Sequence, residues 1–461
     1  LMQLLARLVT PDGGQLMIDS RDTREMAEAI TGQRIAYCGA DSHIFNCSLR
    51  DNMLYGLKHQ PVPEWDRHSV DPASRERQIK EARAADNSID DPDVNWVDYR
   101  ASGVESVDQF KELINRILVT LELDDEALLL GLRETADLEQ HPHLPEQILQ
   151  IRREIADELK KPETATLVEF FDREAYNTNL SVAENIVFGA PLTEAYQYNM
   201  LSNNPLVKEL LREQGLDRIF LETGYRLAEI MLELFAEVDE DDELFEQFSF
   251  IRAEDFPEYE RIHAEVGKYG LEHIDDEDRE MLSAMTFKLT PARHRLGLID
   301  DSLQPLILNV RRALQDSLGE HNEEISFFNI EEFNPAVSIQ DNIVFGRIAY
   351  GKAMAQRTIS EIIQEAVNRS GFRTEIIWSG LDFIAGTGGK HLSVVQRQKI
   401  IVARCLFKNP DILIINDALT ALNPSSLEKI LDNIIAFRQG KNLIWTLDNP
   451  DLEDRFDTVL E

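Results

Sequence analysis

Apolar residues recur every three or four positions through the middle of the chain. This spacing predicts amphipathic helices, and the clearest segments cover residues 107–132, 144–161, 206–216, 225–238 and 303–318. Prolines at 162, 205, 257 and 291 separate the helical segments. No apolar heptad is sustained, so the pattern predicts a packed helical region rather than a long coiled-coil arm.

Short apolar runs near the two ends of the chain predict buried strands. Residues 15–19 and 34–38 form two such runs after a helix that is already under way at Leu1, and Ile412–Asp417 forms another. Strands that alternate with helices indicate an α/β fold with a parallel sheet. Because the first helix starts at the first residue and a strand-like run closes the chain, we expect a fragment of a longer polypeptide.

One sequence unit occurs three times. Its shared core is Asn52–Gly56, Asn185–Gly189 and Asn342–Gly346, and the two later copies extend over residues 166–189 and 325–346. Each copy predicts a strand, a loop and a short helix. The intervals are too long and uneven for a solenoid, so partial duplication of one supersecondary unit explains them better.

Serine and glycine bracket the short helix of each copy. A serine in front of the helix predicts an N-cap, and Glu184 has the spacing of a capping box. A glycine after the helix predicts its C-terminal end. The capping serines are Ser48, Ser181 and Ser338, and the glycines are Gly56, Gly189 and Gly346.

Composition indicates a globular protein with two or three domain-sized cores. The chain has 461 residues, of which 43% are hydrophobic and 28% are charged. No apolar run reaches the roughly 18 residues of a membrane-spanning helix, and no secretory signal opens the chain. Three cysteines without metal-ligand spacing argue against a disulfide framework and favour a reducing compartment.

The charge balance narrows the choice of partners. A net charge of −37 repels nucleic-acid phosphates, so we expect no nucleic-acid binding. The acidic runs between Glu237 and Glu280 predict a solvated helical face rather than a cation site. His141 and His143, close to Glu139, are expected to be polar loop residues rather than metal ligands.

The stretch Leu392–Asn423 resembles the second half of an ATP-binding cassette (ABC) nucleotide-binding domain. It contains, in order, the counterparts of the signature motif, the signature helix, the Walker B strand and the D-loop. The preceding segment, 359–398, resembles the approach to the signature motif in exporter-type cassettes. The resemblance implies an incomplete P-loop NTPase core, built from residues 1–57 and 323–461, with a mainly helical acidic insert at 58–322.

The same resemblance implies ATP and Mg²⁺ as cofactors. It assigns Ser393 and Gln396 to the signature motif, Asn416 to a water on the metal, and Asp417 to the role of candidate general base. No G-x-x-x-x-G-K-[ST] sequence occurs, and a Walker A loop would lie upstream of Leu1. The implied partners are a second nucleotide-binding domain, identical or different, and a membrane permease outside this chain, on the cytoplasmic side of the membrane.

Several positions depart from the family pattern. Ala40 stands where a Gln is expected, two valines replace the signature glycines, and Leu447 replaces a switch His. The carboxylate pair of Walker B is changed as well, since its first member is an amide. The changed positions are Ala40, Val394, Val395, Asn416, Asn423 and Leu447.

Three functions remain open from the sequence. The first is an ATP-binding domain that couples ATP binding and hydrolysis to transmembrane transport, with impaired hydrolysis. The second is a non-hydrolysing regulatory or scaffolding partner of an active cassette, and the third is an interaction module built on 58–322. Ser393 and Gln396 also fit a plain capping box, and Asn416–Asp417 also fits the polar end of a buried strand.

Overall fold

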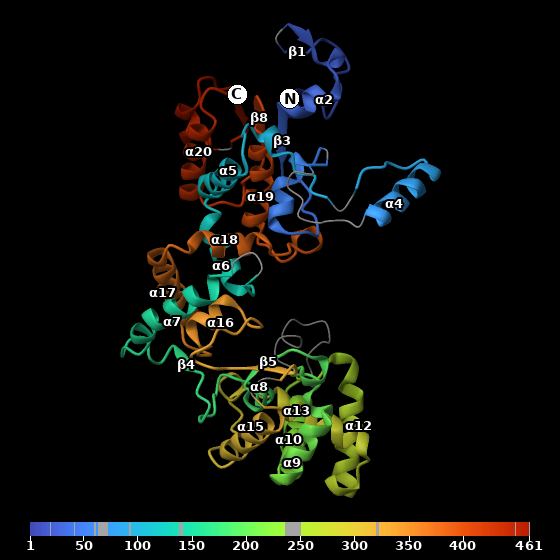
Figure 1. The fold of residues 1–461 in the computed structure, drawn as a ribbon, viewed down its shortest axis with the longest axis vertical. Coiled ribbons are helices and arrows are strands. Elements are labelled where there is room, and N and C mark those ends of the chain that lie inside the picture. Colours follow the sequence, from blue (N-terminus) through green and yellow to red (C-terminus); the bar gives the residue numbers. More distant parts are fainter. Residues whose placement is uncertain are drawn as a thin grey trace. The chain divides into compact units, whose positions relative to one another are not determined.

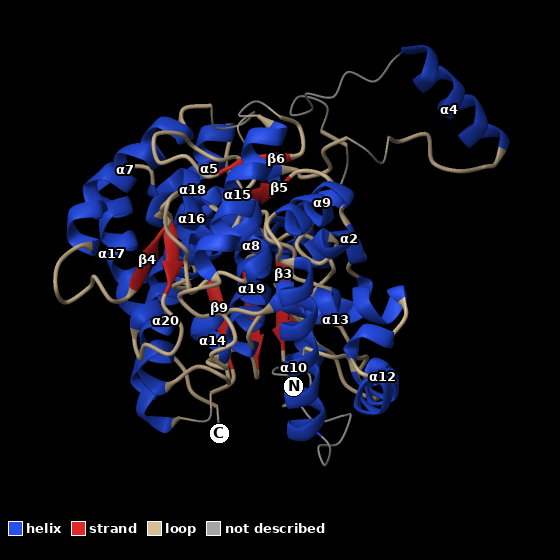
Figure 2. Cartoon of the chain, turned by 90° about the horizontal axis from the view of Figure 1, so that it is seen from below, coloured by secondary structure: helices blue, strands red, loops and turns tan. Residues whose placement is uncertain are grey.

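The computed structural model describes residues 1–461 except 19, 41, 60, 63–71, 92–93, 137, 139–141, 236–249, 320–321, 448 and 461. The chain divides into two compact units (Figure 1). Unit 1 contains Leu1–Gly131 and Ile376–Glu461, and unit 2 contains Leu132–Glu375. Helices dominate both units (Figure 2), and a parallel sheet makes the fold mixed α/β.

Unit 1 is built around a three-stranded parallel sheet in the order β3-β8-β9, with bounds Ile35–Gly39, Ile412–Asn416 and Asn442–Trp445. A separate antiparallel pair, β1 (Met17–Ile18) and β2 (Arg21–Asp22), precedes it. Of the expected strand at 15–19, the described residues form β1 over Met17–Ile18, and Asp19 lies outside the described residues. The helices are α1 (Met2–Leu5), α2 (Glu28–Arg34), α3 (Leu49–Leu54), α4 (Pro72–Ala84), α5 (Val107–Thr120), α6 (Asp124–Arg133), α18 (Arg373–Leu381), α19 (Val394–Phe407) and α20 (Pro424–Phe437).

Unit 2 is mainly helical, with two short antiparallel strand pairs. Its helices are α7 (Leu144–Leu159), α8 (Val182–Val187), α9 (Pro205–Glu213), α10 (Asp217–Phe235), α12 (Phe256–Tyr269), α13 (Asp276–Lys288), α14 (Pro291–His294), α15 (Gln304–Leu318), α16 (Ile339–Val344) and α17 (Ala355–Ser370). Its strands are β4 (Val168–Phe170), β5 (Gly189–Pro191), β6 (Ile325–Phe327) and β7 (Gly346–Ile348). Thirty-two buried residues between Tyr176 and Ile325 form one continuous apolar core.

The last two copies of the repeated unit exchange strands with each other. Strand β4, which opens the second copy, pairs with β7 at the end of the third, and β5 pairs reciprocally with β6. The backbone N–H of Phe171 donates to Phe345 O, and that of Phe328 donates to Phe188 O. The rings of Phe171 and Phe328 stack at 4.2 Å. The two copies therefore form an internal pair with reciprocal contacts.

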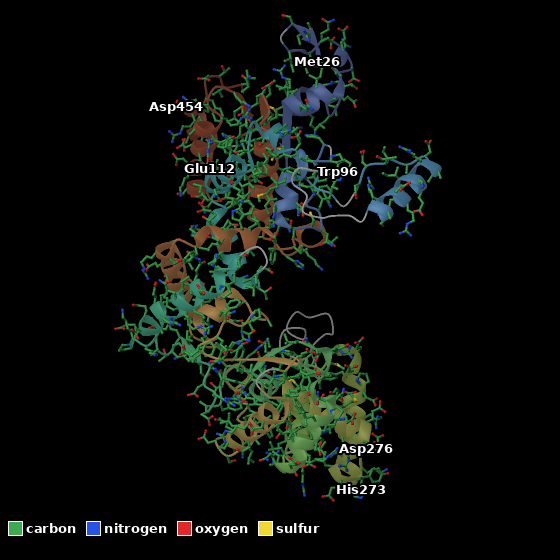
Figure 3. The ribbon with its side chains drawn as sticks, in the orientation of Figure 1. Met26, Trp96, Glu112, His273, Asp276 and Asp454 are labelled. Atoms are coloured by element: carbon green, nitrogen blue, oxygen red, sulfur yellow. The ribbon has the colours of Figure 1, made fainter. Side chains whose placement is uncertain are left out.

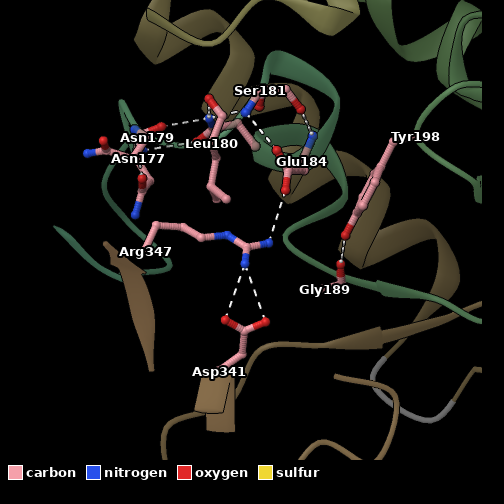
Figure 4. A network of polar contacts seen from close by, with 10 residues as sticks. Asn177, Asn179, Leu180, Ser181, Glu184, Gly189, Tyr198, Asp341 and Arg347 are labelled. Carbon is pink, nitrogen blue, oxygen red and sulfur yellow. Dashed lines mark hydrogen bonds and ion pairs between the residues drawn. The ribbon is translucent and has the colours of Figure 1, made fainter. Parts of the chain in front are cut away.

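All three predicted serine N-caps are confirmed. The side chains of Ser48, Ser181 and Ser338 each accept a bond from the backbone N–H three residues later. Glu184 completes a capping box with Ser181 and also binds Arg347, which bridges it to Asp341 of the third copy (Figure 4).

The three glycines lie where the short helices end, as predicted, but they do not supply the left-handed caps. The left-handed cap residues are Phe188 and Phe345, while Gly189 and Gly346 begin the next strands. Gly56 lies inside a 3-10 turn. A Cβ on Gly189 would meet Ser326 O at 2.5 Å, and one on Gly346 would meet Glu169 O at 2.7 Å. These two glycines permit close strand pairing rather than a positive φ.

Each copy also holds a buried asparagine that an arginine from a distant helix covers. The amide of the asparagine closes the preceding loop by bonding both the N–H and the C=O of one loop residue. The arginine Nε donates to the backbone oxygen of that asparagine at 2.6–2.8 Å. The pairs are Asn52 with Arg404 of α19, Asn185 with Arg311 of α15, and Asn342 with Arg152 of α7.

Among the described residues between Glu237 and Glu280, most acidic side chains are exposed, as predicted. Glu112, Asp276 and Asp454 are exposed (Figure 3). One acid departs from the expected solvated face: Asp278 is buried and forms an ion pair with Arg261. Residues 238–247 of the acidic run lie outside the described residues, as do Glu139 and His141. His143 is exposed at the start of α7.

Candidate functional site

The parallel sheet of unit 1 brings three predicted segments to one edge. In β3 and β8, Gly39 is the register partner of Asn416, and in β8 and β9, Ile415 partners Trp445. Because carboxyl ends of parallel strands meet at one edge, Ala40, Asp417 and Thr446 follow neighbouring strands there. This is the edge at which open α/β sheets bind their ligands.

Asp417 is exposed and sits in a left-handed turn with φ of 52°. Its backbone N–H donates to Thr446 Oγ1 at 2.9 Å, and the Thr446 hydroxyl lies 3.3 Å from Asp417 Oδ1. The Asn416 amide donates to Asp417 Oδ2 at 3.0 Å. The side chains of Asn416, Asp417 and Thr446 thus form one connected group.

Thr446 is a member of this group that the sequence analysis missed. It directly precedes Leu447, the position expected to hold a switch His, and its hydroxyl fixes the turn at Asp417. In the sequence, the only feature that could have pointed to Thr446 is its hydroxyl at the end of a short apolar run. Ala40 and Leu447, as an alanine and a leucine, have no side-chain group that can form a hydrogen bond.

Ser393 and Gln396 form the capping box at the start of α19. Ser393 Oγ accepts from the Gln396 backbone N–H at 3.2 Å, and Gln396 Oε1 accepts from the Ser393 N–H at 2.9 Å. The plain capping box, which the sequence analysis gave as the other interpretation of these two residues, is therefore present. Ser393 and Val394 are exposed, so the beginning of this helix faces solvent.

Buried Gln398 connects α19 to the segment that follows β8. Its Nε2 donates to Thr420 Oγ1 at 3.1 Å, and its Oε1 accepts from Ala421 N at 3.0 Å. This links the signature-like helix with the D-loop-like segment, where Asn423 caps α20 by accepting from Ser426 N. The structure joins Asn416 with Asp417, and Ser393 with Gln396, as two separate hydrogen-bonded pairs.

Several buried or partly buried titratable groups lie in the interior of unit 1 around α19. A hydrogen bond with Cys405 and burial raise the pKa of Cys38. Burial lowers the pKa of Arg404 and of Lys408. Lys399 is buried and binds Glu126 Oε1 at 2.7 Å. These groups stabilise α19 against its neighbours and do not reach the Asp417 edge.

The described residues offer little for a metal ion. Among them there is no group of three His, Cys, Asp or Glu side chains arranged to hold one. At the sheet edge, Asp417 supplies one carboxylate and Asn416 an amide. Within the same part of the chain, no helix is long and apolar enough to cross a bilayer.

The parallel sheet with its polar edge at Asp417, and the capped helix α19 beside it, place unit 1 in the mixed α/β class. Comparison with curated proteins shows that parts of the chain are similar to exporter-type ABC transporter proteins. No protein-family model and no solved structure matches the chain.

Three relatives illustrate the similarity. "Probable multidrug resistance ABC transporter ATP-binding/permease protein YheI" of Bacillus subtilis is 36% identical over 109 residues, which are 22% of this chain and 18% of the relative. "ABC multidrug transporter mdr2" of Aspergillus fumigatus is 33% identical over 26% of this chain and 16% of the relative. "ATP-dependent lipid A-core flippase" of Saccharophagus degradans is 26% identical over 48% of this chain and 40% of the relative. The matches thus span less than half of each relative.

Proposed function

We propose that this chain is the ATP-binding part of an exporter-type ABC transporter that couples ATP binding and hydrolysis to transport across a membrane. Following the sequence, residues 1–57 and 323–461 would form the incomplete P-loop NTPase core and 58–322 the insert, whereas the compact units divide the chain after Gly131 and after Glu375. The observation that carries the proposal is the sheet edge where Gly39 and Asn416 are register partners. It adjoins the Q-loop-like and Walker B-like segments, in a chain with relatives that are named as ABC transporters.

We assign the two hydrogen-bonded pairs to different nucleotides. Asn416 and Asp417 would serve the ATP of this chain, with Asp417 as general base. The exposed start of α19, with Ser393 and Gln396, would face a nucleotide held by a second nucleotide-binding domain, where free N–H groups favour phosphate. Branched Val394 and Val395 restrict that approach, because side chains there keep phosphate from the backbone.

We propose that hydrolysis is impaired. Mg²⁺ prefers oxygen ligands and is usually held by one or two carboxylates together with phosphates. Among the described residues of this edge the carboxylate is that of Asp417, which is also the candidate base, and Asn416 adds no charge; Asp41 and Asp448 lie outside the described residues. The described residues fit a magnesium site poorly, and this misfit supports slow turnover.

The partners follow from the same proposal. A second nucleotide-binding domain, identical or different, and a membrane permease would complete the transporter, with this chain on the cytoplasmic side. The alternative is a non-hydrolysing regulatory or scaffolding domain paired with an active cassette. Ala40 and Leu447 favour that alternative, since neither side chain can orient a water.

The test is ATP binding and turnover by the full natural polypeptide that carries these residues. We expect ATP to bind and turnover to lie below about 1 s⁻¹, the low end of ordinary enzymes. Asp417→Asn should reduce the remaining turnover on the order of 10²-fold, as expected when a catalytic base is lost, and leave binding intact. Glu453→Gln, which removes an exposed acid outside the site, is the matched control.

The outcomes separate the alternatives. Turnover that Asp417→Asn leaves unchanged would remove Asp417 from the mechanism. Tight ATP binding without any turnover would favour the regulatory alternative. Absence of ATP binding by the full polypeptide would contradict both.

A further inference from the structure

Two residues in the left-handed backbone conformation lie close together directly after β8. Asp417 has a φ of 52° and Leu419 a φ of 65°. This conformation is unfavourable for residues other than glycine, because the Cβ atom crowds the backbone. It persists only where surrounding contacts enforce it, and it is concentrated at sites where a side chain has to be held in one position.

The far end of this strained segment is held by α19. Gln398 is buried, and its Oε1 accepts from Ala421 N at 3.0 Å while its Nε2 donates to Thr420 Oγ1 at 3.1 Å. Leu419, between the two ends, is fully buried. The segment therefore has little freedom to relax at this end.

The near end is held by Thr446, which follows β9. Its backbone N–H donates to Ile415 O at 3.0 Å, so the pairing of β9 with β8 fixes where its side chain begins. Its Oγ1 accepts from Asp417 N at 2.9 Å and lies 3.3 Å from Asp417 Oδ1. One hydroxyl group thus contacts both the backbone and the carboxylate of Asp417.

The second carboxylate oxygen of Asp417 also has a donor, since the Asn416 amide donates to Oδ2 at 3.0 Å. With one donor on each oxygen, the carboxylate group is restrained from rotating. Each oxygen keeps further acceptor capacity, and Asp417 is exposed. The restrained carboxylate can therefore still accept a proton from a water at the sheet edge.

We propose that Thr446 is a positioning residue for ATP hydrolysis: its hydroxyl fixes the turn at Asp417 and, with the Asn416 amide, gives the carboxylate one orientation. The inference rests on the proposed function, in which Asp417 is the general base. In that step the carboxylate accepts a proton from a water, the water oxygen bonds to the γ-phosphorus, and the bond from that phosphorus to the leaving ADP oxygen breaks.

The need for such positioning is greater in this chain than in its family. Ala40 and Leu447 stand at the two positions where the resemblance places side chains that orient the water. Neither residue can do so, and the geometry of the step then depends on how the base itself is held. Thr446, one residue before Leu447, provides that restraint from the same strand end.

The test is steady-state ATP turnover by the full natural polypeptide. Thr446→Val keeps the shape of the side chain and removes the hydroxyl. We expect kcat to fall about tenfold, the worth of one hydrogen bond to a charged group, while KM stays within about twofold. Thr446→Ser restores the hydroxyl and should return kcat to within about threefold of the unmodified value. Thr166→Val, the same change at an exposed site of unit 2, is the matched control.

A double variant separates positioning from general stability. In Asp417→Asn the carboxylate is gone, so adding Thr446→Val should lower the remaining turnover by less than about twofold. Far-UV circular dichroism establishes that each variant is folded, and Thr446→Ala replaces Thr446→Val if the latter does not fold.

The outcomes that overturn the inference differ from those that overturn the proposed function. An unchanged kcat in Thr446→Val, or an equal loss with and without the Asp417 carboxylate, would overturn the positioning role alone. No turnover by the unmodified polypeptide would overturn the proposed hydrolysis and this role together, and it is seen before any variant is measured.

Discussion

Buried arginines stabilise the repeated units by donating hydrogen bonds to their backbone oxygens. Arg311 is fully buried, and its guanidinium bonds the backbone oxygens of Asn185, Arg173 and Ala175 while lying 4.1 Å from the centre of the Phe188 ring. Burial lowers the pKa of Arg311 to about 10, so the side chain stays charged at neutral pH. Such a cation is tolerated because carbonyl oxygens surround it.

Arg311→Met should therefore cost more than about 3 kcal/mol, because several buried carbonyl oxygens lose their donor at 1–3 kcal/mol each. Arg312→Met is the matched control: it removes the same charge from an exposed ion pair with Glu174 and should change stability by less than about 1 kcal/mol. All four tryptophans, at 65, 96, 378 and 445, belong to the sequence of unit 1.

Urea unfolding followed by circular dichroism and by tryptophan fluorescence separates the two units. Arg311→Met should shift the dichroism transition and leave the fluorescence transition in place. Equal shifts in both signals, or equal effects of the two variants, would contradict this account.

At the scale of elements, the start of α14 contains a titratable contact. The Thr290 N–H donates to His294 Nδ1 at 2.9 Å, and the imidazole packs against Phe250 at 4.3 Å. Burial, followed by the charge of Arg293, lowers the pKa of His294 from 6.5 to about 4. The folded state therefore holds the neutral imidazole across the range in which the unfolded chain takes up a proton.

Because the folded pKa lies below the unfolded one, this contribution to stability is complete above pH 6.5 and is lost as the pH falls toward 4. The urea midpoint should therefore drop between pH 7.5 and 5.5, and His294→Asn should reduce that drop. The exposed His273→Asn should retain it. A drop that is the same in all three proteins would assign it to other groups.

Much at this scale could be predicted from the sequence, because caps and helical periodicity are local signals. The serine caps, the helices α7, α9 and α15, and strand β3 follow from residues within one turn of each other. The bonds from distant arginines to the buried asparagines of the repeat could not be predicted, and neither could the Thr446–Asp417 contact. Each of them joins residues far apart in sequence. The glycine mechanism was missed for the same reason: the atoms near Gly189 and Gly346 come from the other copy.

At the scale of the whole molecule, the division into units predicts independent responses. Gly346→Ala should destabilise unit 2 by about 1–3 kcal/mol, as overpacking does, because the new Cβ would lie within 3 Å of the backbone of β4. Gly267→Ala, in open space on α12, should be neutral or stabilising by up to about 1 kcal/mol.

Hydrogen exchange read by mass spectrometry provides the measurement. Gly346→Ala should lower protection in β4 and β7 together and leave β3, β8 and β9 unchanged. Lost protection in the unit 1 sheet would show that the two units do not respond independently.

The strand exchange between the repeats sets an order for folding during synthesis. Strand β4 emerges from the ribosome well before its partner β7, and β5 before β6. The helices α9 to α15 lie between these strands in the sequence and contact one another, so they are able to form before the third copy is made. We therefore expect the nascent chain to hold the second copy unpaired until the third is made, so its exposed strand edges are candidates for chaperone binding during that interval.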